Sequence, residues 1–438
     1  MKILEKLIWC DGDVTSTVPE SLFSIGDPCR LGRGRDRIDI IDLPKQEIFG
    51  FGGAFTESSA VNYVKLDAAG RKKVCEDLFG EKGLRYNFCR VCINSSDFAT
   101  GQYWYTRDAD YGLSSFSIKR DKRAVIPFIK DALAASPDGI FLFASPWSPP
   151  AYMKTSGSMI GGSLKPECYR LWAEYFLRFI EEYEKEGIVI SAVTTQNEPG
   201  SHRWESCEWT DGELAKFTGI LSEVFSEYHR EIKILCWDYN RGGMFGHVRN
   251  IYSSLGDRVW GAGFHWYNGD HAGQLLALHE AYPDKVLIET EFCHGLSARM
   301  YGKYRREIIN SLDRYANAVV EWNLLLDEDG GPYHSRDIGC SSPVMLRGDG
   351  VRRSNTYYQS YMFSHFIRRG ARALFTSSAF PHVRTFAARN PDGKLLIYTL
   401  NDSQRDEALT YRIGKYGWQT EAVAGLLTLY VVDPEGEI

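Results

Sequence analysis

Residues 167–199, ECYRLWAEYFLRFIEEYEKEGIVISAVTTQNEP, contain the pattern that decides the fold, an amphipathic helix followed by a short apolar strand. Over residues 167–187, apolar side chains recur at helical spacing and form one stripe. Its members are Leu171, Trp172, Tyr175, Phe176, Phe179 and Ile180. The apolar run at 192–196 is too short for a helix and predicts a buried strand. A helix that leads into a buried strand is the repeating unit of parallel α/β proteins.

The same alternation extends in both directions from this unit. Further helical patterns cover residues 120–136 and 213–229. Eight short apolar runs are candidate strands, at 49–53, 87–93, 140–144, 192–196, 232–237, 261–266, 285–291 and 318–323. Eight strands that alternate with helices are what a (β/α)8 TIM barrel requires, so we predict an α/β fold with a catalytic barrel over residues 47–368.

The two ends of the chain differ from this repeat. Residues 1–46 contain short strand-like runs and turn residues, and a hairpin pattern surrounds Asn390-Pro391-Asp392-Gly393. After about residue 369 no further helical pattern follows. We predict that residues 1–46 and 369–438, the two termini of the chain, together form an attached β-sandwich domain.

Composition and charge exclude several classes of protein. The chain has 438 residues and a net charge of −6, whereas a nucleic-acid partner would favour a basic surface. No apolar stretch approaches the roughly 20 residues of a membrane span. The first residues, MKILEKLIWCDGDV, are interrupted by charges and make a poor signal peptide. We therefore expect a cytoplasmic protein without a membrane span, and its oligomeric state is left open.

Neither the cysteines nor the glycines indicate a cofactor. Ten cysteines are scattered without the spacing of a disulfide framework, so we expect reduced thiols. Cys89 and Cys92 spell CxxC, but a strand places residues three apart on opposite faces, which disfavours a metal site. The glycines of FGFGGAF (49–55) lack the dinucleotide spacing, and no phosphate loop, GxSxG elbow or HExxH motif occurs. We expect no metal and no organic cofactor.

Two carboxylates lie where the chemistry of a barrel is expected. Active sites of such barrels lie at the C-terminal ends of the strands. Glu198 follows the fourth predicted strand in the sequence Gln196-Asn197-Glu198-Pro199, and Glu291 ends the seventh. Paired carboxylates are what glycoside hydrolysis requires, one to protonate the leaving oxygen and one to attack or to activate water. Either glutamate alone is explained by a solvated charge or a salt bridge, but the pair beside Asn197 and several tryptophans favours catalysis.

The aromatic content is also high, with 11 Trp, 25 Tyr and 23 Phe. Aromatic rings pack well against the flat CH faces of sugars, although a large core also uses many of them. Composition alone therefore does not choose between a carbohydrate site and a large core.

Six segments carry a family resemblance. They are GFGGAFTESSA (50–60), SPWSPPAYMKTSGSM (145–159), TTQNEP (194–199), FHWYNGDH (264–271), ETEFC (289–293) and EWNLLLDEDGGP (321–332). In order and in register, they resemble the landmark segments of family 30 glycoside hydrolases, the glucosylceramidase family, from about residue 49 to 370. The NEP motif is shared by many retaining barrels, whereas the segment around SPWSPP, with HWY and EWNL, is specific to the family.

The resemblance implies a retaining β-glycosidase that acts on a carbohydrate or glycoside substrate without metal or cofactor. Glu198 takes the acid/base position and Glu291 the nucleophile position. The residues that match substrate-binding positions in the wall of the glycone pocket are Asp97, Trp147, Asn197, His265, Tyr267 and Trp322. The resemblance also implies a flanking β-domain built from both termini, which agrees with the pattern at the two ends.

The resemblance does not fix the role of every residue near the pocket. Strand eight has Glu321 where glucosylceramidases usually have an aspartate. Trp204 and Trp209, which follow the NEP motif, are candidates either for the aglycone side of the pocket or for packing. Glu289 lies two residues before Glu291 and could be mistaken for the nucleophile, but Glu291 is at the strand tip and matches the family pattern in Thr290-Glu291-Phe292-Cys293.

The sequence favours one class of substrate and leaves several others open. The glucosylceramidase-like segments favour an exo-acting β-glucosidase, with glucosylceramide-type lipids and thus sphingolipid metabolism as one option. The alternatives are a β-xylosidase, a β-fucosidase or a β-1,6-glucanase of the same family, or a carbohydrate-binding protein that has lost catalysis. We expect a cytoplasmic enzyme to favour small imported glycosides over polymers.

Overall fold

The computed structural model describes residues 1–10, 12–24, 36–295, 301–334, 339–348, 350–378 and 380–435. The chain divides into two compact units. The first comprises Met1–Gly50, Ser297–Ala318 and Arg353–Ile438, and the second comprises Phe51–Leu296 and Val319–Arg352.

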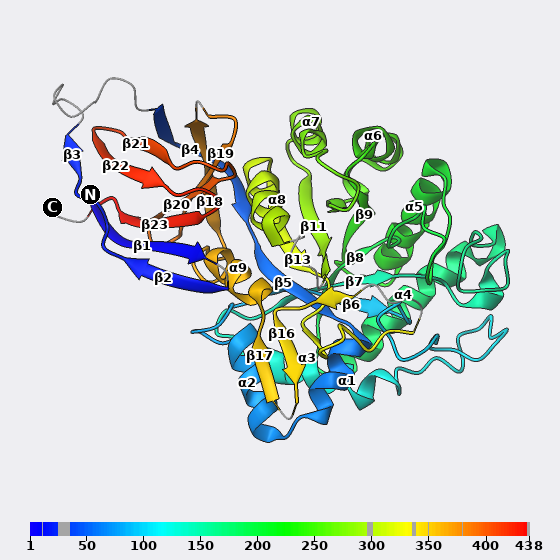
Figure 1. Cartoon of the computed structure of the whole chain (residues 1–438). Coiled ribbons are helices and arrows are strands. Elements are labelled where there is room, and N and C mark those ends of the chain that lie inside the picture. The colour runs from blue at the N-terminus through cyan, green and yellow to red at the C-terminus, as the bar shows by residue number, and fades with distance from the viewer. Residues whose placement is uncertain are drawn as a thin grey trace. The chain divides into compact units, whose positions relative to one another are not determined.

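Eight strands form a closed barrel in the order β10-β11-β13-β5-β6-β7-β8-β9 (Figure 1). In chain order they are β5 (Gly50–Phe55), β6 (Phe88–Ile93), β7 (Phe141–Pro146), β8 (Ile190–Thr194), β9 (Lys233–Asn240), β10 (Gly261–His265), β11 (Val286–Phe292) and β13 (Ala316–Glu321). From β5 round to β11 the neighbouring strands run parallel. Each strand overlaps one of the eight predicted runs, so the predicted barrel is confirmed.

Two glycines allow the barrel strands to approach closely. A Cβ added to Gly52 would lie 2.0 Å from the carbonyl oxygen of Phe88 on β6. A Cβ added to Gly261 would lie 2.1 Å from the carbonyl oxygen of Val286 on β11. No side chain fits at such distances, which explains the glycines within the runs FGFGG and GAGFHW.

Helices alternate with the barrel strands. In the second unit they are α1 (Glu57–Lys65), α2 (Ala68–Leu78), α3 (Val125–Ala135), α4 (Tyr169–Lys185), α5 (Asp211–Glu227), α6 (Met244–Leu255) and α7 (Gly273–Ala281). The predicted apolar stripe of α4 is buried, except that Leu171 is only partly covered. Helix α5 begins with a capping box between Thr210 and Glu213, which satisfies two backbone donors at its start.

Shorter elements complete the second unit. Two small sheets pair β12 (His294–Gly295) with β15 (Cys340–Ser341) and join β14 (Leu325–Leu326), β16 (Val344–Arg347) and β17 (Gly350–Arg353). The single-turn 3-10 helices in the described part of the chain are η1 (Asp121–Arg123), η2 (Ala151–Met153), η3 (Pro166–Cys168) and η4 (Gly256–Arg258). The sequence pattern did not predict these elements, because each is too short to show a hydrophobic period.

The first unit is built on one ten-stranded sheet, in the order β2-β1-β23-β20-β19-β18-β4-β21-β22-β3. The N-terminal strands are β1 (Lys2–Cys10), β2 (Asp13–Thr17), β3 (Phe23–Ser24) and β4 (Asp36–Ile48). The C-terminal strands are β18 (Ala371–Ser378), β19 (Val383–Arg389), β20 (Leu395–Asn401), β21 (Glu407–Ile413), β22 (Tyr416–Ala422) and β23 (Leu427–Asp433). Helices α8 (Tyr301–Asp313) and α9 (Asn355–Ser364) also belong to this unit.

Both termini contribute to this sheet, as predicted, because β1 pairs with β23 and β4 pairs with β18 and β21. The expected hairpin around Asn390 is confirmed by the antiparallel pairing of β19 with β20. The sheet encloses its own core in the manner of a sandwich, since Trp418 on β22 stacks on Tyr411 and lies 5.3 Å from the ring of Tyr430 on β23. Hydrogen bonding nevertheless runs continuously through one sheet rather than through two.

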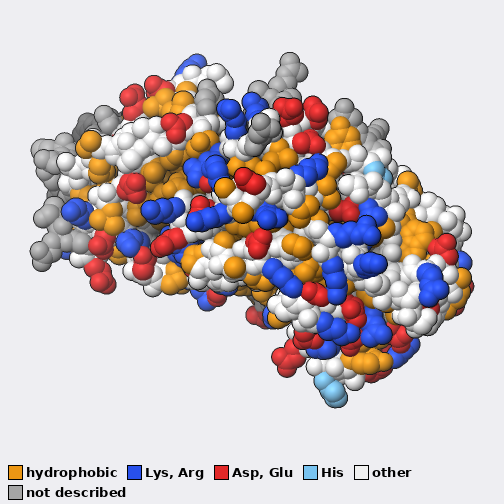
Figure 2. Space-filling view, turned by 90° about the horizontal axis from the view of Figure 1, so that it is seen from below, with side chains coloured by type: hydrophobic (Ala, Val, Ile, Leu, Met, Phe, Trp, Pro, Cys, Tyr) orange, Lys and Arg blue, Asp and Glu red, His pale blue; other side chains and the backbone are white. Residues whose placement is uncertain are grey.

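Figure 2 shows one face of the molecule, where acidic and basic side chains are interspersed with apolar ones. This mixture agrees with the modest net charge of −6. In the described part of the chain, no helix is both long and apolar enough to cross a membrane.

Candidate active site

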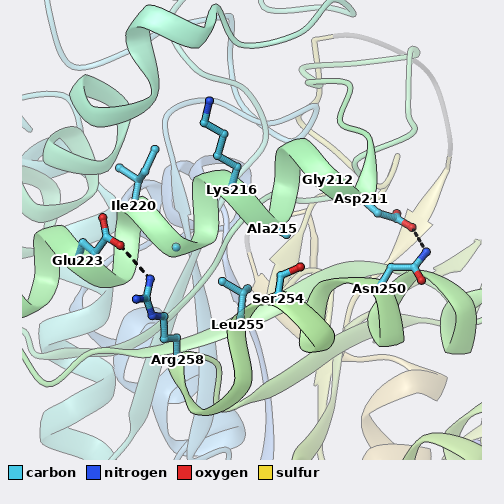
Figure 3. A pocket seen from close by; sticks show the side chains of 11 residues that line it. Asp211, Gly212, Ala215, Lys216, Ile220, Glu223, Asn250, Ser254, Leu255 and Arg258 are labelled. Carbon is cyan, nitrogen blue, oxygen red and sulfur yellow. Dashed lines mark hydrogen bonds and ion pairs between the residues drawn. The ribbon is translucent and has the colours of Figure 1, made fainter.

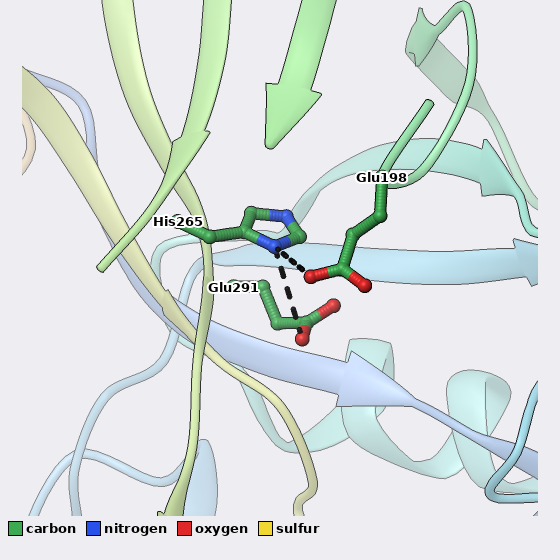
Figure 4. A group of neighbouring side chains, drawn as sticks. All are labelled: Glu198, His265 and Glu291. Atoms are coloured by element: carbon green, nitrogen blue, oxygen red, sulfur yellow. Dashed lines mark hydrogen bonds and ion pairs between the residues drawn. The ribbon is translucent and has the colours of Figure 1, made fainter. Parts of the chain in front are cut away.

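Three side chains from three strand ends converge at the mouth of the barrel (Figure 4). Glu198 follows β8, His265 ends β10 and Glu291 lies on β11. Nδ1 of His265 lies 3.2 Å from Oε1 of Glu198 and 4.0 Å from Oε1 of Glu291. One carboxylate oxygen of each glutamate and a ring nitrogen of His265 all lie within 4.8 Å of one another. The structure thus brings together the two glutamates that the sequence placed on separate strands.

The backbone at this site is held in an unusual conformation. Glu198 has a φ of +47° and Asp238, at the end of β9, has a φ of +59°. The amide of Glu198 donates a 2.9 Å hydrogen bond to the carbonyl oxygen of Asp238. Left-handed backbone at non-glycine residues is costly and persists only where surrounding contacts enforce it, and such residues gather at functional sites.

Arg90 contacts more residues of the site than the motifs of the sequence suggested, since no motif pointed to it. Its guanidinium is fully buried and donates hydrogen bonds of 2.8 Å to Oε2 of Glu291, to Oδ2 of Asp238 and to Oδ1 of Asn197. Its Nε donates to the hydroxyl of Ser145 at 2.9 Å. The pattern that could have revealed it is the single charge inside the apolar strand NFCRVCI, because a buried arginine must be paired.

Asp238 is the second residue without a predicted role. Besides Arg90, it accepts hydrogen bonds from Nε2 of His265 at 3.0 Å and from the hydroxyl of Thr194 at 2.6 Å. The hydroxyl of Thr290 also donates to it. Burial alone would raise the pKa of the Asp238 carboxyl, but the Arg90 charge and these donors hold that pKa below its usual range. Asp238 is therefore a fixed negative charge beneath the two glutamates.

His265 lies between carboxylates on both sides, which decides its charge. Burial alone would lower its pKa, but the carboxylates of Glu291, Asp238 and Glu198 outweigh burial and raise the pKa to about 10. Both ring nitrogens then carry a proton, and both donate to carboxylate oxygens.

Glu291 is tightly held. Its Oε1 accepts a 2.9 Å hydrogen bond from the hydroxyl of Tyr267, and its Oε2 accepts from Arg90. Burial raises the pKa of the Glu291 carboxyl above its ordinary value, with a smaller contribution from Glu198, although the charges of His265 and Arg90 oppose this shift. The donors on both oxygens favour the carboxylate form, because each requires an acceptor.

The other predicted pocket residues lie around this centre. The rings of Trp147 and Trp322 stack at 4.8 Å with an interplanar angle of 21°, and the Arg90 guanidinium lies 4.5 Å from the Trp147 ring. Asp97 is 6% exposed, and its buried Oδ1 has no hydrogen-bond partner within the described part of the chain. Burial and the charge of Glu291 raise the pKa of the Asp97 carboxyl well above its usual range. A buried polar atom of this kind is a ready partner for a substrate hydroxyl.

The structure shows the surroundings of the two tryptophans and two glutamates whose roles the sequence left open. Trp204 packs against the cluster that contains Trp147 and Trp322. Trp209 instead stacks on Phe217 of α5 at 5.3 Å and donates to Gln196, so it has the packing role. Glu289 and Glu321 are both buried.

A further buried carboxylate, Glu205, lies in the loop after β8. It is fully buried, accepts a 2.9 Å hydrogen bond from Ser95 and lies 2.9 Å from Nε2 of His334. The hydrogen bond to Glu205 raises the pKa of His334, although burial opposes it. The sequence did not predict this pair, because its members are 129 positions apart in loops without a recognised motif.

A second hollow lies between α5 and α6, on the outside of the barrel (Figure 3). We call it the α5–α6 groove; its lining residues include Asp211, Lys216, Glu223, Asn250 and Arg258. Glu223 pairs with Arg258 at 2.9 Å, and Asn250 donates to Asp211 at 2.8 Å. Glu223 and Arg258 thus form an exposed ion pair, and such pairs contribute little because water screens their charges.

Comparison with known proteins gives a consistent result. The model of the glycosyl hydrolase family 30 TIM-barrel domain matches residues 48–368. The lysosomal acid glucosylceramidase of Mus musculus is 31% identical over 396 residues, which cover 83% of this chain and 77% of that protein. The structure of SrfJ from Salmonella typhimurium has a TM-score of 0.90 and 28% identity, over 98% of this chain and all of that one. The endo-β1,6-glucanase BT3312 has a TM-score of 0.86 and 25% identity, over 98% of this chain and 99% of that one.

Proposed function

The chain belongs to glycosyl hydrolase family 30, and from this membership and the paired carboxylates we propose that it is a retaining β-glycosidase. The observation that carries the proposal is the approach of Glu198 and Glu291, which have carboxylate oxygens within 4.8 Å of each other. Retaining glycosidases hold their two carboxyl groups about 5 to 5.5 Å apart, whereas inverting enzymes need about 6.5 to 9.5 Å to admit a water molecule between them.

The proposed reaction is a double displacement. The Glu291 carboxylate attacks the anomeric carbon while protonated Glu198 donates its proton to the leaving oxygen. The bond to the aglycone breaks, and a glycosyl ester on Glu291 forms. Glu198, now ionised, then takes a proton from water, which attacks the anomeric carbon and releases the sugar and the free Glu291 carboxylate.

The surrounding residues prepare this pair for its two roles. Tyr267 and Arg90 each donate to one oxygen of Glu291, so the carboxylate is fixed in orientation before the substrate arrives. His265 donates toward Glu198 and is itself fixed by Asp238 on its other nitrogen. We therefore assign Arg90, His265 and Asp238 as positioning residues that act through the two glutamates.

The glycone pocket follows from the same arrangement. The paired rings of Trp147 and Trp322 offer an apolar wall for a sugar face. Because Oδ1 of Asn197 accepts from Arg90, its amide nitrogen is the group left to donate to the 2-hydroxyl. The buried Oδ1 of Asp97 is available to a hydroxyl farther from the anomeric carbon.

We propose a β-glucoside as the substrate, on the strength of relatives that are named glucosylceramidases. The similarity to an endo-β1,6-glucanase supports β-1,6-linked glucan as the second candidate. A panel of aryl β-glucoside, β-xyloside, β-fucoside and β-galactoside identifies the glycone. Glucosylceramide and β-1,6-linked oligosaccharides then identify the aglycone. Release of glucose alone from the oligosaccharides indicates exo action, whereas release of shorter oligosaccharides indicates the glucanase.

The test of the mechanism is Glu291→Gly with the best aryl glycoside. Loss of the nucleophile should lower kcat by about 10^4-fold or more, comparable to the loss for a whole catalytic unit. Added azide should restore turnover and give a glycosyl azide of inverted configuration. Glu223→Gly, at an exposed ion pair outside the barrel, is the matched control and should keep wild-type kcat. Undiminished hydrolysis by Glu291→Gly would remove Glu291 from the nucleophile role.

A further inference from the structure

Two cysteines 47 positions apart lie in contact beside the proposed nucleophile. The Sγ atoms of Cys293 and Cys340 are 2.7 Å apart, so the two thiols are in direct contact. Strand pairing holds them there, because Gly295 of β12 is opposite Cys340 of β15. Cys29 lies outside the described residues.

The pair belongs to the wall of the proposed glycone pocket. Cys293 comes two positions after Glu291, and Cys340 is part of the buried cluster that contains Trp147 and Trp322. Cys293 packs against that cluster and is partly exposed, whereas Cys340 is only 3% exposed. Cys293, the more exposed of the two, is therefore the thiol that a reagent reaches first.

We propose that Cys293 and Cys340 form a modification site for low-molecular-weight disulfides, at which Cys340 resolves adducts formed on Cys293. The site belongs to this chain's own thiol pair and is separate from the glycosidase chemistry. Its effect on activity rests on the proposed function, since that effect requires the pocket to bind the sugar.

The reaction is two thiol–disulfide exchanges. The Cys293 thiolate attacks one sulfur of a disulfide RSSR, a Cys293–SR bond forms, and RS⁻ leaves. The Cys340 thiolate then attacks the Cys293 sulfur, a Cys293–Cys340 disulfide forms, and the second RS⁻ leaves. Overall the two protein thiols lose two electrons and two protons, and RSSR is reduced to two RSH.

The geometry makes the second step fast relative to escape of the adduct. Sulfur atoms already in contact need little backbone movement to bond, and the β12–β15 pairing keeps them together. An adduct that stayed on Cys293 would project a bulky group beside Glu291 and fill the pocket. Resolution by Cys340 removes that group and leaves only a bond between two side chains that already touch.

The first step should be slow at neutral pH. The hydrogen bond with Cys340 raises the pKa of the Cys293 thiol, and burial and the charge of Glu291 raise it further. Only the thiolate attacks a disulfide, so the rate should increase with pH above neutrality. The dithiol is thus stable in a reducing compartment and responds to sustained rather than brief oxidation.

The experiment uses glutathione disulfide with the full chain at pH 8.5, followed by peptide mass spectrometry. We expect wild type to give a Cys293–Cys340 disulfide with no glutathione on either of these two cysteines, and dithiothreitol to reverse it. Cys340→Ala should instead accumulate a glutathionyl group on Cys293, and Cys293→Ala should remain unmodified at Cys340. Cys10→Ser, which removes an exposed thiol of the first unit, is the control and should oxidise at Cys293 and Cys340 like wild type.

Activity provides the second readout. Oxidised wild type should keep more than half of its aryl-glycosidase kcat/KM, whereas glutathionylated Cys340→Ala should lose at least tenfold and recover with dithiothreitol. A stable glutathione adduct on wild-type Cys293, or no linkage between the two cysteines, would overturn the proposal. Because the linkage is detected by mass, a failure of the glycosidase assignment alone would leave this result intact and remove only the activity effect.

Discussion

The barrel mouth and the α5–α6 groove both contain carboxylates, but the carboxylates of the barrel mouth are buried, whereas that of Glu223 in the groove is exposed. At the barrel mouth, Glu198 is 5% exposed and Glu291 is 7% exposed. In the α5–α6 groove, the side chains of Glu223 and Arg258 are 57% and 51% exposed. His265 and Asp238, buried at the same mouth, shift each other's pKa values, whereas the exposed side chains of the groove form an isolated pair.

The difference shows which physical feature identifies an active site. A hollow with acidic side chains is common, and water screens its charges at little cost. Burying several coupled charges costs several kcal/mol unless each one is paired, so a protein keeps such a network only where the network is complete. At the barrel mouth this completeness depends on Arg90, which joins Glu291, Asp238 and Asn197.

Removing Arg90 should have the largest effect. Arg90→Met removes the guanidinium that pairs with both buried carboxylates, Asp238 and Glu291, and the free energy of unfolding should fall by about 3 to 5 kcal/mol. Activity should be lost with it, because Glu291 and Asn197 lose a shared support. Urea denaturation and kcat/KM for an aryl glycoside measure the two effects.

Arg90→Lys separates the effect of the positive charge of Arg90 from the effect of its hydrogen-bond geometry. Lysine keeps the positive charge but cannot donate to Asp238, Asn197 and Ser145 from one planar group. We expect a folded variant with intermediate stability and strongly reduced kcat/KM. A stability of Arg90→Met within about 1 kcal/mol of wild type would contradict the network model.

The charge of His265 should give the barrel mouth a distinctive pH dependence. Its pKa is raised in the folded state to about 10, from an ordinary value of about 6.5. The stability it contributes is therefore fully present below about pH 6.5, and it decreases as the pH rises through about 10. His265→Asn removes this contribution, so the stability gap between wild type and variant should be a few kcal/mol at pH 6 and shrink by pH 10.5.

Measuring the gap between the two proteins cancels the other groups that titrate in this range. Denaturation midpoints and slopes at pH 6, 8, 9 and 10.5 supply the comparison. A gap that stays constant over these values would mean that His265 is neutral in the folded protein, and the role assigned to it between Glu198 and Asp238 would be wrong.

The same network explains which parts of the site could be predicted from the sequence and which could not. The barrel strands were predictable because each is a separate apolar run, and Glu198 and Glu291 were candidates because they lie at the C-terminal ends of two of those runs. Arg90 was not, because its partners come from four different strands or loops and meet only when the barrel closes. The contact between Cys293 and Cys340 likewise depends on the two-residue strands β12 and β15, which have no hydrophobic period.

Removing the hydroxyl of Tyr267 tests a single contact of the network, its hydrogen bond to Glu291. Tyr267→Phe removes one donor to Glu291 and leaves Arg90 in place. A hydrogen bond to a charged group contributes about 1.5 to 3 kcal/mol, so kcat/KM should fall by roughly 10- to 150-fold. Tyr228→Phe, at the exposed end of α5, is the matched control and should be silent. Equal kcat/KM values for the two variants would show that Tyr267 does not orient the nucleophile.

The smallest effect should come from the α5–α6 groove. Glu223→Gln removes the charge of an ion pair whose two side chains are more than half exposed. Such pairs contribute between zero and about 1 kcal/mol, so stability should change by less than about 0.5 kcal/mol and kcat/KM should stay at the wild-type value. A tenfold loss of activity in Glu223→Gln would mean that the groove communicates with the barrel mouth. Burial would then not be what separates the two regions, and the assignment of the site would have to rest on the strand-end position of Glu198 and Glu291 alone.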